Sequence, residues 1–107
     1  MNSPDFYNTA DYNVSIDSDL EELIPGYLEG RRKDANTILA EIENNNFEEI
    51  RVIGHTMKGT GGGYGFDIIT DIGKAIETGA KENNREDIEK AVDRLVIFLD
   101  NVIISYE

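Results

Sequence analysis

Apolar residues recur at intervals of three and four positions along four stretches of this 107-residue chain. Such spacing places the apolar side chains on one face of a helix. We therefore predict helices over about residues 25–43, 47–62, 67–82 and 85–104. No stretch shows the period-two alternation of a half-buried strand. Short loops between four amphipathic helices predict an all-α fold, an antiparallel up-down four-helix bundle.

Pro25 lies in the first apolar stretch, and a helix interior does not accept proline. Because proline fits the first turn of a helix, we favour a long helix that starts there, preceded by a short helix. A single helix kinked at the proline is the alternative. Residues 1–17 show no periodicity, so we expect a loose N-terminal arm, held to the body by an aromatic side chain, Val14 or Ile16. The four-helix domain then spans residues 18–107.

The charge of the chain restricts its partners. With 22 acidic and 10 basic residues, the formal charge of −12 repels nucleic-acid phosphates and anionic membranes, so we expect neither as a partner. The chain has no cysteine, no apolar run of membrane-spanning length and no signal-peptide pattern at its start, which fits a cytoplasmic protein. We expect one domain, most simply a monomer, with a small oligomer as the alternative.

His55 is the only histidine, and Lys58 and Gly59 follow it by three and four positions. Residues at these offsets share one face of a helix. On a helical wheel for residues 47–64, His55 points away from the apolar stripe, so we expect an exposed imidazole instead of a buried core histidine. A nucleophile, a cation and a residue without a side chain then stand together, which suits phosphate. A surface histidine without a role is the remaining alternative.

Three glycines near the end of the same helix support a role for the histidine. A glycine inside a helix costs up to about 1 kcal/mol relative to alanine, so three of them require a reason. We expect Gly59 and Gly62 to leave a depression beside the imidazole that another protein can approach. Gly61 is expected to serve a tight helix contact. Lys58 would offset the charge of a phosphoryl group.

Basic residues are expected to gather around the histidine despite the negative net charge. Arg51 precedes His55 by one helical turn, and an antiparallel first helix would bring Arg31, Arg32 and Lys33 to the same level. Arg31 falls on the apolar stripe of its own helix. It would either emerge at the seam and reach a phosphate, or cover the core with its aliphatic stem.

With these residues placed, the chain resembles the histidine-containing phosphotransfer (HPt) domains of bacterial two-component phosphorelays. The resemblance covers about residues 18–104. It rests on three short motifs: His55-x-x-Lys58-Gly59, Tyr64-Gly65-Phe66 and Ile72-Gly73-x-x-Ile76-Glu77. It implies that the histidine is phosphorylated and that the lysine and glycine of the first motif support the phosphate.

The resemblance further implies that a receiver domain phosphorylated on aspartate, or a sensor kinase, gives its phosphoryl group to His55, and that another receiver takes it. The Mg²⁺ for the reaction would belong to the receiver, and no intrinsic cofactor or metal is expected. The glycine run lacks the residue order of a P-loop, so the chain would be a phosphoryl carrier and not an enzyme. From their positions alone, Arg31, Arg51 and Gly62 are candidates for receiver docking or phosphate contact.

Two other functional classes stay open. The chain could be a helical docking module for receivers or kinases that carries no phosphate and binds through its acidic surface. A small enzyme, such as a phosphohistidine phosphatase, is less well supported because no second catalytic group accompanies His55. A metal site built from one histidine and scattered carboxylates is weaker still.

Overall fold

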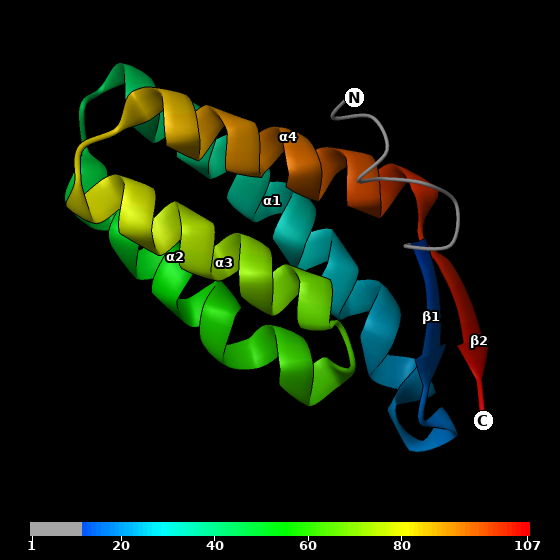
Figure 1. Ribbon diagram of the computed structural model, residues 1–107. Helices are drawn as coiled ribbons and strands as arrows, with labels where there is room; N and C mark the ends of the chain where they lie inside the picture. Colours follow the sequence, from blue (N-terminus) through cyan, green and yellow to red (C-terminus); the bar gives the residue numbers. More distant parts are fainter. Residues whose placement is uncertain (1–11) are drawn as a thin grey trace, which may run out of the picture.

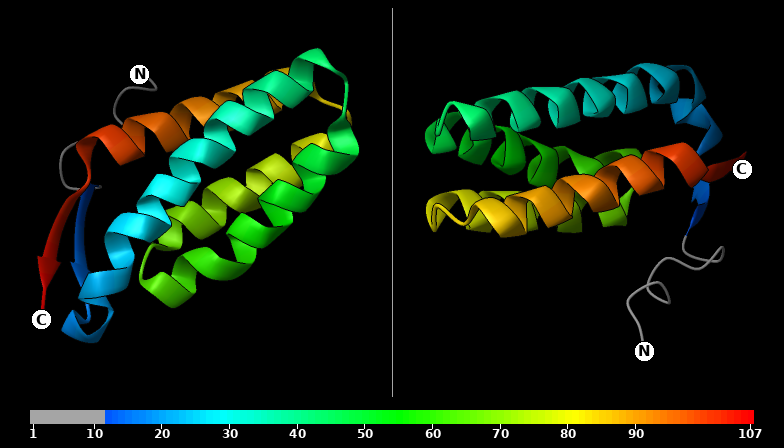
Figure 2. Two further views of the ribbon diagram at one scale, coloured as in Figure 1. Left: turned by 180° about the vertical axis from the view of Figure 1, so that it is seen from behind. Right: turned by 90° about the horizontal axis from the view of Figure 1, so that it is seen from above.

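The structure, a computed structural model, describes residues 12–107 and contains the four helices that the apolar pattern predicts (Figure 1). The loops between the first and second helices and between the third and fourth lie at one end of the bundle, and the remaining connection lies at the other (Figures 1 and 2). Consecutive helices therefore reverse direction. The prediction of a helical bundle is confirmed for helices α1 (Ile24–Glu43), α2 (Phe47–Gly61), α3 (Asp67–Lys81) and α4 (Arg85–Asn101).

Asparagines end α1 and α3 and start the helices that follow. Asn45 and Asn83 have positive φ angles of 55° and 52°, a conformation that asparagine adopts more readily than most residues. The side chains of Asn46 and Asn84 then cap α2 and α4 by accepting backbone N–H groups of their first turns. Both helix breaks lie where the sequence predicts them. The same holds for Pro25, which lies in the first turn of α1, after a short 3₁₀ helix.

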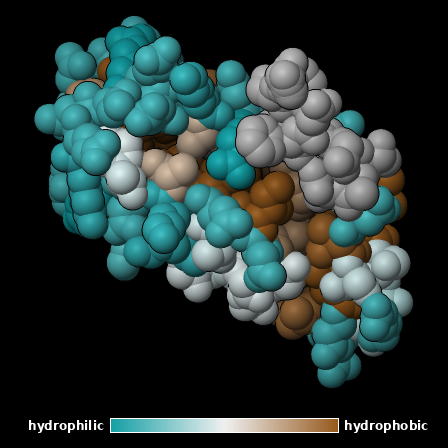
Figure 3. All heavy atoms as spheres, viewed as in Figure 1, coloured by the Kyte–Doolittle hydropathy of each residue, from teal (hydrophilic) through white to brown (hydrophobic). Residues whose placement is uncertain are grey.

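The core consists of the apolar stripes of the four helices, which face one another. Ile38, Ile50, Ile72 and Leu95, one from each helix, are fully buried. Hydrophilic residues cover most of the face seen in Figure 3, and hydrophobic residues show mainly toward the end of the molecule that carries residues 13–16 and 103–106. The core therefore fixes the relative positions of the helices, including the helix that carries the single histidine.

The structure differs from the prediction at the end of the fourth helix. α4 stops at Asn101 instead of Ile104, and strand β2 (Ile103–Tyr106) follows. β2 pairs in parallel with strand β1 (Asn13–Ile16), which belongs to the predicted N-terminal arm. The β-branched residues 102–104 adopt extended backbone readily, and β1 supplies hydrogen-bond partners that a longer helix would not need. The prediction of a helix up to Ile104 is wrong for this reason.

The described part of the predicted arm packs as part of the domain. Tyr12 and Ile16 are only 8 % and 1 % exposed, and Val14 is half-buried against the core. An aromatic residue and the two named aliphatic residues thus anchor the segment. The remainder of the arm, residues 1–11, lies outside the described residues.

Candidate functional site

Glycines allow α2 and α3 to pack against each other with almost no gap. A Cβ atom added to Gly54 would lie 2.7 Å from the backbone nitrogen of Glu77, and one added to Gly73 would lie closer still to the backbone nitrogen of Lys58. One added to Gly61 would lie 2.5 Å from the backbone nitrogen of Thr70. No side chain fits at these positions. The contact therefore brings residues of α3 within reach of the exposed face of α2.

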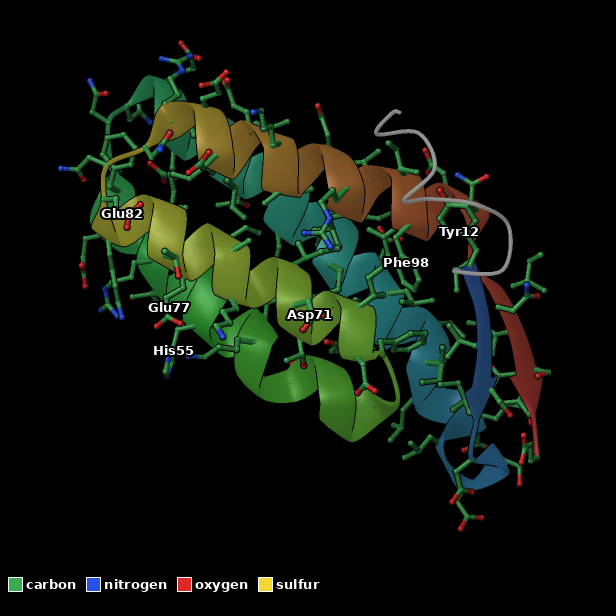
Figure 4. All side chains as sticks on the ribbon, in the orientation of Figure 1. Tyr12, His55, Asp71, Glu77, Glu82 and Phe98 are labelled. Carbon is green, nitrogen blue, oxygen red and sulfur yellow. The ribbon has the colours of Figure 1, made fainter. Side chains whose placement is uncertain are left out.

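His55 stands on the exposed face of α2, as its place on the helical wheel predicts. Its side chain is 63 % exposed. The Nδ1 atom of the imidazole lies 3.0 Å from Oε2 of Glu77 on α3, and Figure 4 shows the two side chains next to each other. One ring nitrogen is therefore engaged with the protein, while most of the side chain is exposed to solvent.

Glu77 is an acidic side chain held in a largely buried position between cations. Its side chain is 7 % exposed, and its Oε1 atom lies 2.7 Å from the ammonium of Lys58. Lys81, one turn further along α3, lies 3.8 Å from the other oxygen. The hydrogen bond from Lys58, followed by the one with His55, lowers the pKa of the Glu77 carboxyl to about 2. The carboxylate is therefore ionised near neutral pH and can only accept hydrogen bonds.

The ionised carboxylate determines which imidazole nitrogen carries the proton. An acceptor next to Nδ1 requires Nδ1–H as the donor, because Glu77 has no proton to offer. In the neutral imidazole the lone pair then lies on Nε2. The site thus presents a nucleophilic nitrogen of His55 to solvent without any base having to remove a proton.

The two predicted supporting residues differ in their surroundings. Lys58 forms an ion pair with Glu77, whose other carboxylate oxygen contacts His55. The helical offsets of Lys58 and His55 did not indicate this shared partner. Gly59 has open space around it, since an added Cβ would meet no atom within 4 Å. Gly61 packs tightly against α3, as expected, and Gly62 is exposed, with its N–H donating to Thr70 Oγ1 at 2.8 Å.

The predicted gathering of basic residues around His55 is only partly present. Arg32 bonds Asp100 and the backbone oxygen of Leu99 on α4, so its predicted place beside the histidine is wrong. The reason is that its position on α1 faces the fourth helix instead of the second.

The other two arginine candidates contact carboxylates of their own helices. Arg51 bonds Glu48 through two nitrogens, at 3.0 and 2.6 Å. The pKa of the Arg51 guanidinium is raised mainly by Glu48, with a smaller contribution from the charge of Glu77. Arg51 is therefore close enough to Glu77 to feel its charge. Arg31 bonds Asp34 at 2.9 Å. Neither arginine contacts His55 directly among the interactions of the described residues.

A groove between α1 and α2 adjoins the histidine on its other side. Arg31 lines it, with its guanidinium 4.4 Å from the ring centre of Tyr27. Thr56, the residue after His55, and Thr60 line the opposite wall, and Thr60 Oγ1 lies 3.0 Å from the Tyr27 hydroxyl. The charged end of Arg31 thus lies over an aromatic ring in the wall of this groove, and its reach toward a phosphate stays a prediction.

Glu77 is the residue that the site-by-site sequence reasoning missed. In the sequence, Glu77 stands out only as the last residue of the motif Ile72-Gly73-x-x-Ile76-Glu77. Two signals pointed to it: Gly73 one turn earlier marks a close approach to another helix, and Lys81 one turn later places a cation beside the carboxylate. What the sequence alone does not provide is the pairing of Gly73 with Gly54 across the contact, which brings the carboxylate to His55.

The described residues also bear on metal binding and on membrane insertion. Across residues 12–107, no three histidine, cysteine or acidic side chains are arranged to hold a metal ion. Within the same range, none of the helices is both long and apolar enough to cross a membrane.

Comparison with protein-family models matches residues 19–103 to the family described as Hpt domain. The matched range includes all four helices up to the start of β2, and with them both His55 and Glu77. Comparisons with curated proteins and with solved structures gave no match.

Proposed function

The chain belongs to the Hpt domain family, a family of phosphocarrier modules in phosphorelays, and on this premise we propose that His55 accepts a phosphoryl group on Nε2 from a phospho-aspartyl receiver domain or a kinase and passes it to another receiver. The observation that carries the proposal is the hydrogen bond between His55 Nδ1 and the ionised Glu77, which in the neutral imidazole places the lone pair on Nε2 of a largely exposed side chain.

The chemical step balances with the groups at hand. Nε2 of His55 attacks the phosphorus in line, the N–P bond forms, and the bond between phosphorus and the aspartyl oxygen breaks to release a carboxylate. No proton has to leave Nε2, and the positive charge that develops on the ring is offset by Glu77 through the Nδ1–H bond. The reverse sequence on a second receiver returns the imidazole to its starting state. Because phosphoryl transfer depends mainly on positioning and charge stabilisation, these few groups suffice.

In this proposal the Mg²⁺ ion that the reaction needs is bound by the receiver domain.

The charge around His55 favours a bound phosphoryl group. Lys58 and Lys81 share Glu77, so the cluster of two ammonium groups and one carboxylate carries a net positive charge beside the imidazole. Such a cluster favours a bound phosphoryl group, whose charge approaches −2 near neutral pH. Arg51 supplements it, because its partner Glu48 is exposed and exposed ion pairs are weak enough to exchange partners.

The receiver would dock on the surface around His55. Val52, one turn before the histidine, exposes 43 % of its surface, and Gly59, one turn after it, leaves open space. Thr56 leads from there into the groove that Arg31 lines. An apolar contact, a gap and a polar groove side by side allow a receiver to bring its aspartate close to Nε2. Since the partners of such a carrier act inside the cell, a cytoplasmic location belongs to the proposal.

The proposal is tested by incubating the protein with a panel of phosphorylated receivers and autophosphorylated kinases carrying labelled phosphate. We expect label that is stable to alkali and lost in acid, as for phosphohistidine. The variant His55→Gln should fold normally, because the side chain is largely exposed, and should take up no label. Tight binding of a receiver without any label on His55 would instead identify a docking module that carries no phosphate.

A further inference from the structure

The two strands form a small parallel sheet at one end of the bundle. In Figures 1 and 2, β1 lies against the helical body and β2 lies on the outside. Parallel sheets are normally covered, and a sheet of only two strands is marginally stable by itself. Among residues 12–107, no strand pairs with the outer edge of β2, which calls for an explanation.

The hydrogen bonds between the strands show which backbone groups form this edge. The N–H of Glu107 donates to Ile16 at 3.0 Å, and the N–H of Ser18 donates to Glu107 at 2.9 Å. Backbone groups of successive strand residues point to opposite edges, so the N–H and C=O groups of Ile104 and Tyr106 point away from β1. Within residues 12–107, no hydrogen bond reaches these outward groups.

Apart from its short length of four residues, this edge carries none of the usual protections against strand pairing among residues 12–107. Natural edge strands are commonly guarded by charged residues, proline or a bulge. The five residues 102–106 contain no charge and no proline, although 30 % of the chain is charged. Ile103 and Tyr106 are 53 % and 36 % exposed, and hydrophobic residues gather at this end of the molecule in Figure 3. The strand thus has the composition of an edge that is paired.

We propose that β2 pairs in an antiparallel manner with β2 of a second copy of this chain, about a two-fold axis that passes beside Ser105. This axis places Ile104 opposite Tyr106 of the other copy, so that their outward N–H and C=O groups form four hydrogen bonds and a four-stranded sheet results. Pairs of a β-branched and an aromatic residue are favourable across strands.

Charge is compatible with this pairing despite the net charge of −12. Glu107 is the charged residue nearest the axis along β2. The strand rise separates the two Glu107 residues of the pair by about 14 Å, beyond the screening length of about 8 Å at physiological salt. Repulsion between the whole molecules persists, so we expect the dimer to strengthen as the salt concentration rises. His55 lies well away from the strands in Figure 4, so both copies keep an open phosphate site.

The absence of cysteine makes a direct test simple, because a single introduced cysteine reports on one distance. In the proposed dimer the two Ser105 Cα atoms are about 4.5 Å apart, within the range of a disulfide. Ser15 lies beside Ser105 on β1 and is also exposed, but two added strand spacings put its copies about 14 Å apart. Under diamide, Ser105→Cys should form a disulfide-linked dimer at least about tenfold faster than the matched control Ser15→Cys.

A second measurement uses the unmodified chain. Sedimentation up to about 1 mM protein should show a weak dimer that strengthens with salt, because an interface of a few strand residues is small. Equal cross-linking rates for the two cysteine variants, or a monomer throughout this range, would overturn the proposal. If the chain stays monomeric while a lysine-flanked strand peptide shifts the NMR amide signals of Ile104 and Tyr106, the edge binds a different protein strand and self-pairing is wrong.

Discussion

The glycine contact between α2 and α3 provides a sharp test of how the fold positions the site. The change is Gly73→Ala, which adds one methyl group. That methyl would lie under 3 Å from three backbone atoms, two of Lys58 and one of Gly54. Backbone atoms inside a helix cannot move aside by themselves, so the two helices would have to separate. The matched control is Gly59→Ala, which adds the same methyl group where nothing lies within 4 Å.

Two opposing effects set the size of the change. Replacing glycine by alanine inside a helix stabilises it by about 0.5–1 kcal/mol, and both variants gain this amount. Overpacking typically costs about 1–3 kcal/mol, and a clash with backbone belongs at the upper end. We therefore expect Gly73→Ala to lower the free energy of unfolding by about 2 kcal/mol, since the clash exceeds the gain. Gly59→Ala should raise it by about 0.5–1 kcal/mol.

Urea and thermal unfolding followed by circular dichroism measure both values. For a domain of this size about 1 kcal/mol corresponds to about 4–8 °C in Tm, so Gly73→Ala should melt about 8–16 °C below the unmodified protein. The control should melt about 2–8 °C above it. If the two variants shift in the same direction, or if Gly73→Ala is neutral, the close approach of α2 and α3 is not what the structure describes.

Three further predictions concern the site. Glu77→Gln should slow phosphotransfer by about tenfold or more, because an amide can donate to Nδ1 and so permit the tautomer that carries its proton on Nε2. ¹⁵N NMR of the His55 ring would show the tautomer change, and an unchanged ring spectrum would contradict the prediction. The pKa of Glu77 is lowered from 4.5 to about 2, so the ionised carboxylate contributes fully to the free energy of unfolding above about pH 4.5, and this contribution is lost as the pH falls through about 2. Unfolding experiments should therefore show a smaller loss of stability in acid for Glu77→Gln than for the unmodified chain. Gly59→Leu should stabilise the helix yet slow transfer by at least about tenfold, because the leucine fills the open space beside Gly59 that a docking receiver is proposed to occupy. An unchanged transfer rate in a receiver assay would refute this role for the open space.

The helices and the exposure of His55 could be predicted from the sequence because both depend on local periodicity. Apolar residues at helical spacing define the buried face, and the position of His55 relative to that face follows from 100° per residue. Asparagine turns and Pro25 set the helix ends through local backbone preferences. Each of these properties is decided within about one turn of helix.

The strands and Glu77 could not be predicted in the same way, because each depends on a partner far along the chain. Residues 102–104 fit the helical stripe of α4 as well as a strand, and only β1, about ninety positions earlier, decides for the strand. Matching levels on adjacent helices predicts Arg32 beside His55. The height of a residue along its helix does not fix the direction of its side chain around the helix axis, and Arg32 points to α4.

The glycines at the helix contact and the chemistry at the histidine are parts of one arrangement. Gly54 immediately precedes His55, and the backbone of Glu77 lies where a side chain at Gly54 would be. A longer distance between the helices would draw the carboxylate away from Nδ1, and a hydrogen bond of 3.0 Å does not survive a separation of an ångström. The proton on Nδ1 would then no longer be fixed, and Nε2 would carry it part of the time. The absence of two side chains in the core of the contact is therefore what holds His55 in the arrangement on which the proposed phosphoryl transfer depends.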